Sequence, residues 1–302
     1  MATPDIITEP LPYGQLHNCQ PTLDDSQVIA FCRDGYLKLD SVIDDDINRK
    51  VINYIEQENT DAEPTPIMQF DWFTDGVLKH PQVAGTVRSL LGRNFKLPML
   101  VTDHCGPLPY ECPDPGGGWH RDAPCIYNQL NQVQVFYYPQ AVTLEQGPLE
   151  ILPGSHQIPT KGPMMANYGH ITGTLSTVSP AGTVWVMAQP IWHRRPRASA
   201  KATKDYRFRH LFKCSYWRTT TPQRDWKRIE GFDFSKADYM AGQGVLFEQG
   251  YTRLGTARLF CWLLGEQYNY VGGQSWPNSG RWSGDKSPTM PHILRRDGKK
   301  EV

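Results

Sequence analysis

The stretch Gly116-Gly117-Gly118-Trp119-His120-Arg121-Asp122-Ala123-Pro124 places an imidazole and a carboxylate two residues apart, just after a glycine-rich bend. On a β-strand, residues i and i+2 point to the same face, so His120 and Asp122 can reach one point in space. One more histidine would complete a 2-His-1-carboxylate triad, which leaves the opposite metal positions open and suits non-haem Fe(II) oxygen chemistry. The stretch therefore predicts two thirds of a metal site.

The composition favours a β-rich protein without a strong net field. The 302 residues include 26 glycines and 25 prolines but only 21% charged residues, a balance that favours many short strands and turns over a helical bundle. The 31 basic residues equal the 31 acidic ones, so net charge does not draw the chain onto nucleic acid or an anionic membrane. We expect a small-molecule substrate, no nucleic-acid partner and no membrane partner.

Cysteine usage and the N-terminal sequence bear on the compartment. The seven cysteines are scattered without a CxxC pair, which argues against a disulfide framework and a thiolate zinc site. The first residues are acidic and proline-bearing, unlike a signal peptide, and no apolar run approaches the roughly 20 residues of a membrane span. We expect reduced thiols and a cytoplasmic location.

Helix signals occupy the first 95 residues and strand signals the next 125. Caps and apolar stripes predict helices between Asp24 and Gly35, from Asp44 through Ile55, and from Pro81 to Leu91. Strands are predicted over 95–105, 118–122, 131–138, 148–152, 182–188 and 205–218, and a closing helix over 258–264. This order suggests helices that support one side of a β-sandwich or jelly roll.

His193 is the best candidate for the missing ligand. It follows the apolar strand and turn Gly182–Trp192, which would hold its imidazole on rigid backbone. His17, His80, His156 and His170 lie in the leader, before a helix or in a loop, and Pro153–His156 has the composition of a structural turn. An isolated HxD pattern or an isolated histidine more often belongs to ordinary hydrogen-bonded structure, so context has to decide.

Several motifs in one order supply that context. The chain resembles the phytanoyl-CoA dioxygenase family of Fe(II)/2-oxoglutarate oxygenases in four segments: Phe31–Tyr36, Trp119–Asp122, Gly147–His156 and Ala181–His193. The resemblance runs from about residue 24 to about residue 218. It implies a double-stranded β-helix, a jelly-roll or cupin-like barrel that is mainly β with flanking N-terminal helices.

The resemblance also implies cofactors and roles. Fe(II) would be held by His120, Asp122 and His193, with 2-oxoglutarate and O2 as co-substrates and succinate and CO2 as products. The far carboxylate of 2-oxoglutarate needs a cation that binds it with two hydrogen bonds, and the planar fork of arginine suits it. In the family this arginine lies after the distal histidine, in the pattern Arg-x-x-apolar-x-x-x-aromatic, which Arg209 fits; Arg207 is the second choice.

The separation of 16 residues between His193 and Arg209 is longer than the usual gap in the family. On the 131–138 strand, Gln132 and Gln134 are expected to line the cofactor pocket. Related halogenases carry a small residue in place of the aspartate, so Asp122 favours hydroxylation, desaturation or epoxidation over chlorination.

Three further features have two interpretations each. The basic cluster Arg194–Arg197 with Lys201 and Lys204 is either a solvated loop or a site for an anionic substrate. The 154–181 connection and the 272–282 tail are either lids that exclude water or ordinary surface packing.

We expect a single oxygenase domain over 1–302, made of a leader (1–23), helical support (24–94), a barrel core (95–218) and a C-terminal extension (219–302). The expected function is a 2-oxoglutarate-dependent dioxygenase that hydroxylates a small organic molecule. The alternatives are a non-catalytic jelly-roll sensor that binds a metal or ligand, and a demethylase with the same triad. Neutral net charge counts against a nucleic-acid demethylase. The substrate itself does not follow from family membership.

Overall fold

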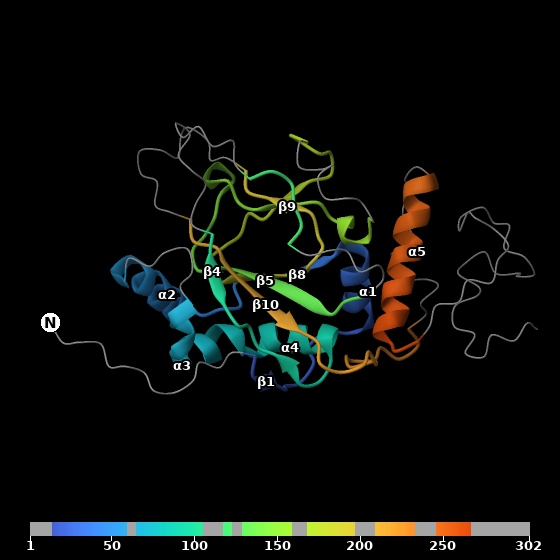
Figure 1. Ribbon diagram of the computed structural model, residues 1–302, viewed down its shortest axis with the longest axis horizontal. Coiled ribbons are helices and arrows are strands. Elements are labelled where there is room, and N and C mark those ends of the chain that lie inside the picture. Colours follow the sequence, from blue (N-terminus) through green and yellow to red (C-terminus); the bar gives the residue numbers. More distant parts are fainter. Residues whose placement is uncertain are drawn as a thin grey trace, which may run out of the picture.

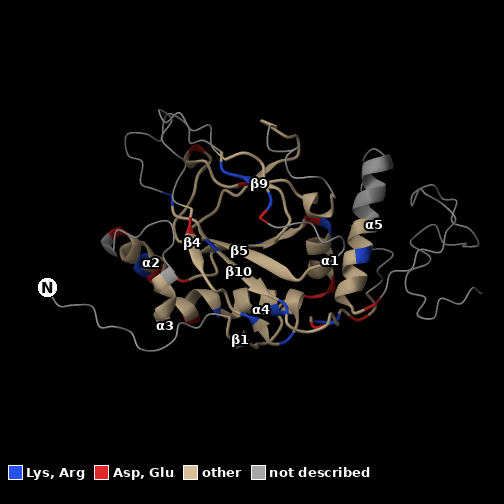
Figure 2. Cartoon of the chain, viewed as in Figure 1, with Lys and Arg blue, Asp and Glu red and all other residues tan. Residues whose placement is uncertain are grey.

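A computed structural model of the chain describes seven segments, residues 14–58, 65–104, 117–122, 129–158, 168–196, 209–232 and 246–266. Two antiparallel sheets lie at the centre, with helices at the sides and below in Figure 1. Basic and acidic residues both occur around the helices and around the upper sheet (Figure 2). In the described segments, every helix is too short or too polar to cross a membrane.

The larger sheet has seven strands. Their order is β1-β3-β10-β5-β8-β2, and β4 also pairs with β10. The bounds are β1 Leu16–His17, β2 Tyr36–Leu39, β3 Phe95–Lys96, β4 Val101–Asp103, β5 Gln132–Tyr138, β8 Thr183–Ala188 and β10 Phe212–Trp217. The long central strands β5 and β8 agree closely with the predicted strands 131–138 and 182–188. The predicted strand 95–105 is two short strands, because Pro98 lies between them and has no N–H to donate to a ladder.

The smaller sheet has three strands in the order β7-β6-β9, with bounds β6 Glu150–Ile151, β7 Leu175–Ser176 and β9 His193–Arg194. The strand predicted over 118–122 is not regular, since only His120 forms a bridge, to His193. Its partner β9 is two residues long and is followed by Pro196, which cannot donate a ladder hydrogen bond.

The core has two parts, one on each face of the larger sheet. Apolar side chains between the two sheets include Phe136, Tyr138, Ile151, Trp185 and Met187. This is the sandwich expected of a jelly roll, although the two sheets are not joined by strand pairing in the described residues. The opposite face of β5, β8 and β10 packs with the helices in one larger cluster.

The helices support that second face (Figure 1). Their bounds are α1 Asp25–Asp34, α2 Asp45–Glu58, α3 Asp71–Phe73, α4 Pro81–Leu91 and α5 Leu246–Leu263. A capping box formed by Asp24 and Gln27 begins α1, and Gly35 ends it with φ +81°, a left-handed conformation that glycine adopts without strain. Short 3-10 and π turns, η1 Thr65–Gln69 and η2 Thr74–Leu78, flank α3; η3 Leu144–Gln146 and η4 Ser155–Gln157 flank β6.

The closing helix is longer than predicted. The prediction of 258–264 is wrong at its start, because α5 begins at Leu246 and includes two glycines that are poor helix formers. Packing explains one of them. A Cβ at Gly255 would lie 2.4 Å from Oε1 of Gln157, so this glycine lets α5 approach η4 closely.

Part of the C-terminal extension is fastened to the helical support. The buried carboxylate of Asp25 accepts hydrogen bonds from the indole of Trp226 and the amide of Ile229, both at 2.8 Å. Arg224 forms a 2.8 Å ion pair with the same carboxylate. Residues 224–229 thereby cover the N-terminal end of α1.

Candidate metal centre

The two candidate histidines occupy the same tripeptide in two places. Trp119-His120-Arg121 runs antiparallel to Trp192-His193-Arg194, with paired backbone hydrogen bonds of 3.0 Å in both directions between His120 and His193. Directly opposed residues of an antiparallel pair point to the same face. The two imidazoles therefore lie side by side, with ring centroids 4.3 Å apart.

The flanking residues meet on the opposite face and form what we call the Trp–Arg clamp: Trp119, Arg121, Trp192 and Arg194. The Arg194 guanidinium lies 4.9 Å from the ring centre of Trp119, and that of Arg121 lies 4.5 Å from the ring centre of Trp192. Both tryptophans are buried. Two cation–π contacts thus lock the register that places His120 opposite His193.

The clamp also fastens the ends of a long connection. Arg121 donates a 2.7 Å hydrogen bond to the carbonyl of Ile158. Both Trp119 and Arg194 donate to the carbonyl of Gly169. The chain between these carbonyls includes 159–167, part of the 154–181 segment considered as a lid, and 159–167 lies outside the described residues.

Asp122 completes a triad with the histidines. Its Oδ1 lies 3.8 Å from Nε2 of His120, and its Oδ2 lies 3.4 Å from Nε2 of His193. One ligand atom from each of the three residues lies within 4.8 Å of the other two. His193 is buried, whereas half of the His120 side chain is exposed, so the cluster lies at the boundary between core and solvent.

The backbone sets the tautomer of both histidines. Nδ1 of His120 lies 2.9 Å from the carbonyl of Gly118, and Nδ1 of His193 lies 3.1 Å from the carbonyl of Ile191. A carbonyl oxygen only accepts, so each Nδ1 carries the proton and donates it. In the neutral form of each imidazole, Nε2 then carries no proton and is available as a metal ligand.

Electrostatics favours the ligand form of His193 and of Asp122. Burial lowers the pKa of His193 to about 4, so its imidazole is neutral near pH 7. Burial by itself would raise the pKa of Asp122, but attraction to His193 and Lys213 and a hydrogen bond from Gln134 outweigh it and lower that pKa to about 2. Because His193 is uncharged near pH 7, Lys213 and Gln134 are the partners that hold the carboxylate ionised there.

Three of the other predicted site residues, Gln132, Gln134 and Arg209, lie in the described part of the chain. Nε2 of Gln134 donates to Oδ2 of Asp122 over 2.5 Å, whereas Gln132 is a half-buried residue at the start of β5. Arg209 is fully buried, and its Nη1 lies 3.3 Å from the hydroxyl of Tyr138. Arg207 lies outside the described residues.

A match to one family model decides the relationship. The model of phytanoyl-CoA dioxygenase matches residues 31–207, more than half of the chain. The chain belongs to the phytanoyl-CoA dioxygenase family. This family uses Fe(II), 2-oxoglutarate and O2, and the triad lies inside the matched region. The chain is thus an oxygenase of the Fe(II)/2-oxoglutarate class.

Solved structures share the fold of this dioxygenase-family chain. HygX from Streptomyces hygroscopicus, crystallised with nickel and 2-oxoglutarate, has a TM-score of 0.51 at 15% identity and covers 74% of this chain and 96% of its own. The non-haem α-ketoglutarate-dependent epimerase SnoN, from nogalamycin biosynthesis, has a TM-score of 0.50 at 15% identity, with 72% and 89% covered. No curated protein sequence matches the chain.

The residues of this family member fit the two groups that the family uses. Two imidazole nitrogens and one carboxylate oxygen converge from one side, which is the donor set and arrangement of non-haem Fe(II) sites. Arg209 supplies a second observation. It is a fully buried cation whose Nε has no hydrogen-bond partner, and it pairs with no acidic residue in the described part of the chain. A buried guanidinium in that state fits an anionic ligand.

Two features of the site were missed from the sequence, and one of them is visible in it. The repeated Trp-His-Arg tripeptide was a direct signal that the two histidine segments pair. The other feature is Lys213 of β10, whose Nζ lies 2.5 Å from Oδ2 of Asp122.

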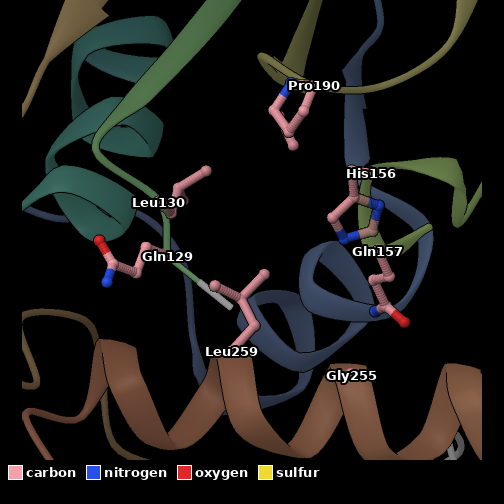
Figure 3. Close-up of a pocket in the computed structure, with 8 residues that line it drawn as sticks. Gln129, Leu130, His156, Gln157, Pro190, Gly255 and Leu259 are labelled. Atoms are coloured by element: carbon pink, nitrogen blue, oxygen red, sulfur yellow. The ribbon is translucent and has the colours of Figure 1, made fainter. Parts of the chain in front are cut away.

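Other candidates from the sequence are not members of the triad. His156 is buried in η4, where its Nε2 hydrogen-bonds the carbonyl of Cys32 at 3.0 Å, in agreement with a structural turn. In the basic cluster, Arg194 is paired with Glu150 at 2.5 Å, while 197–204 lie outside the described residues. A small cavity between α5 and η4 is lined by His156, Gln157, Leu259 and five neighbours, and none of the triad residues is among them (Figure 3).

Proposed function

We propose that this chain is a single-domain dioxygenase that hydroxylates a small organic substrate with release of succinate and CO2. The observation that carries the proposal is the convergence of His120, Asp122 and His193 within 4.8 Å of one another. Membership of a family that uses Fe(II), 2-oxoglutarate and O2 supports it. The presence of Asp122 favours oxygenation over halogenation, because its carboxylate would take the metal position that a halide takes in related halogenases.

Each residue has a defined task in this proposal. His120 and His193 offer Nε2 to iron, and their Nδ1–H bonds to backbone carbonyls fix the ring orientation. Asp122 offers a carboxylate oxygen, oriented by Gln134. When bound, iron with 2-oxoglutarate and O2 supplies the oxidising chemistry, and the protein positions the reactants and excludes water.

Arg209 is our choice for the far carboxylate of 2-oxoglutarate. Its full burial and its unpartnered Nε support this choice over Arg207. The hydroxyl of Tyr138 accepts a hydrogen bond from the guanidinium and donates to Oγ1 of Thr177, so Tyr138 helps to hold Arg209 in place. Gln134 is our candidate at the metal end, where it donates to Asp122, and Gln132 is the second candidate, two residues earlier on β5.

Four described cysteines, Cys19, Cys32, Cys214 and Cys261, are free thiols. This supports the proposed cytoplasmic location, because thiols persist in a reducing compartment.

Turnover coupled to substrate tests the proposal. Purified protein with Fe(II), 2-oxoglutarate and a metabolite extract of its native cell is expected to form succinate and a product heavier by one oxygen. Asp122→Ala is expected to abolish coupled succinate formation while the circular dichroism spectrum stays the same. His170→Ala, at an exposed histidine, is the matched control and should retain activity. Full activity of the Asp122 variant would refute the assignment.

A further inference from the structure

Lys213 places an ammonium group beside the triad. It lies on β10, opposite Phe136 of β5, and only 18% of its side chain is exposed. Its Nζ lies 2.5 Å from Oδ2 of Asp122. The resemblance to the family assigned no role to this lysine.

The same carboxylate oxygen is shared by three groups. Besides Lys213, Gln134 donates to Oδ2 at 2.5 Å, and Nε2 of His193 lies 3.4 Å away. A first-row metal such as zinc binds a carboxylate oxygen at about 2.0–2.2 Å. A metal at this oxygen and an ammonium at 2.5 Å from it would be two positive charges a few ångströms apart in a partly buried site, where they repel strongly.

The cosubstrate can relieve that repulsion. 2-Oxoglutarate brings two negative charges, and its 2-oxo acid end is the part expected beside the metal. A flexible lysine side chain can move its ammonium by a few ångströms from one anion to another. With metal at Oδ2, the anionic cosubstrate is then the partner to which Lys213 can move.

We propose that Lys213 couples metal binding to cosubstrate binding: it pairs with Asp122 in the metal-free protein, opposes metal alone, and pairs with the 2-oxo acid when both are bound. The inference rests on the proposed function. By linkage, the metal and 2-oxoglutarate then tighten one another's binding by the same factor.

The test is Ni(II) affinity with and without 2-oxoglutarate, which needs no turnover. Calorimetric titrations would compare wild type, Lys213→Met and the control Lys96→Met, which removes an exposed lysine on the neighbouring strand β3. The affinity of Ni(II) for 2-oxoglutarate in buffer is measured separately and subtracted. Lys213→Met should bind Ni(II) alone at least about tenfold more tightly than wild type. The factor by which 2-oxoglutarate tightens Ni(II) binding should be smaller in Lys213→Met than in wild type by about the same amount.

The outcomes separate this inference from the proposed function. If Lys213→Met binds Ni(II) no more tightly than wild type, or keeps the full gain from 2-oxoglutarate, the coupling role is wrong. If wild type binds no Ni(II), or Asp122→Ala binds it as well as wild type, the metal site itself is wrong. Should Lys213→Met not fold, Lys213→Gln removes the charge and keeps a hydrogen-bond donor, and the same expectations apply to it.

Discussion

Replacing Arg194 by Met tests whether the Trp–Arg clamp holds the metal histidines in register. Arg194 and its partner Glu150 are less than one fifth exposed, and the ring of Trp119 below the guanidinium is fully buried. Loss of a charge-assisted hydrogen bond accounts for about 1.5–3 kcal/mol and loss of a partly desolvated cation–π contact for about 1–2 kcal/mol. Met keeps most of the apolar stem, so we expect the free energy of unfolding to fall by about 3 kcal/mol.

The same variant should change metal binding. Without the clamp, the His120–His193 bridge is less ordered in the metal-free protein, and the metal has to restore it. Loss of groups that orient metal ligands typically weakens affinity by about 10–100-fold, and we expect about tenfold for Arg194→Met. Urea unfolding of the metal-free protein and Ni(II) titration measure the two effects.

A matched control comes from another cation–π contact. Lys38 lies 5.5 Å from the ring centre of Trp185, between β2 and β8. Lys38→Met should lower stability only slightly and leave Ni(II) affinity unchanged. The clamp does not hold the histidines in register if Arg194→Met unfolds like wild type, or if it loses stability while binding Ni(II) normally.

Three further predictions concern the fold. Asp25→Asn should lower the free energy of unfolding in urea by about 2–3 kcal/mol, because a buried carboxylate that holds the indole of Trp226 loses its charge; an unchanged midpoint would contradict that role. Gly182→Ala should lower the free energy of unfolding in the same assay by about 3 kcal/mol or more, since φ is +76° and a Cβ would lie 2.3 Å from the carbonyl oxygen of Ile43. An unchanged free energy of unfolding would contradict this close contact. Burial lowers the pKa of His156 to about 4, so the unfolded chain binds a proton that the folded chain does not between pH 4 and 6.5. The free energy of unfolding should therefore fall as pH falls through that window. In His156→Gln, the slope of this free energy against pH should be smaller by about 1.4 kcal/mol per pH unit; equal slopes in the two proteins would overturn the lowered pKa of His156.

The parts predicted from the sequence are those with local signals. The caps at Asp24 and Gly35 mark the ends of α1, and the apolar runs of β5 and β8 are long enough to show their period. The HxD pattern and the turn before His193 identified the three residues that the structure brings together.

The parts that were missed depend on tertiary context. The strands β6, β7 and β9 have two residues each, too few for any periodicity. The start of α5 was missed because packing at Gly255 overrides weak helix propensity. Lys213 could be placed only once the register of β10 against β5 was known, since a lysine on a strand more commonly faces solvent.

The central claim is that His120, Asp122 and His193 hold iron in a form that 2-oxoglutarate can chelate. Anaerobic addition of Fe(II) and then 2-oxoglutarate, followed by visible absorption, tests it most directly. We predict the weak charge-transfer band of the iron–2-oxoglutarate chelate in the wild-type protein and its loss in Asp122→Ala. Absence of the band in the wild-type protein, or an equal band in both proteins, would contradict the account.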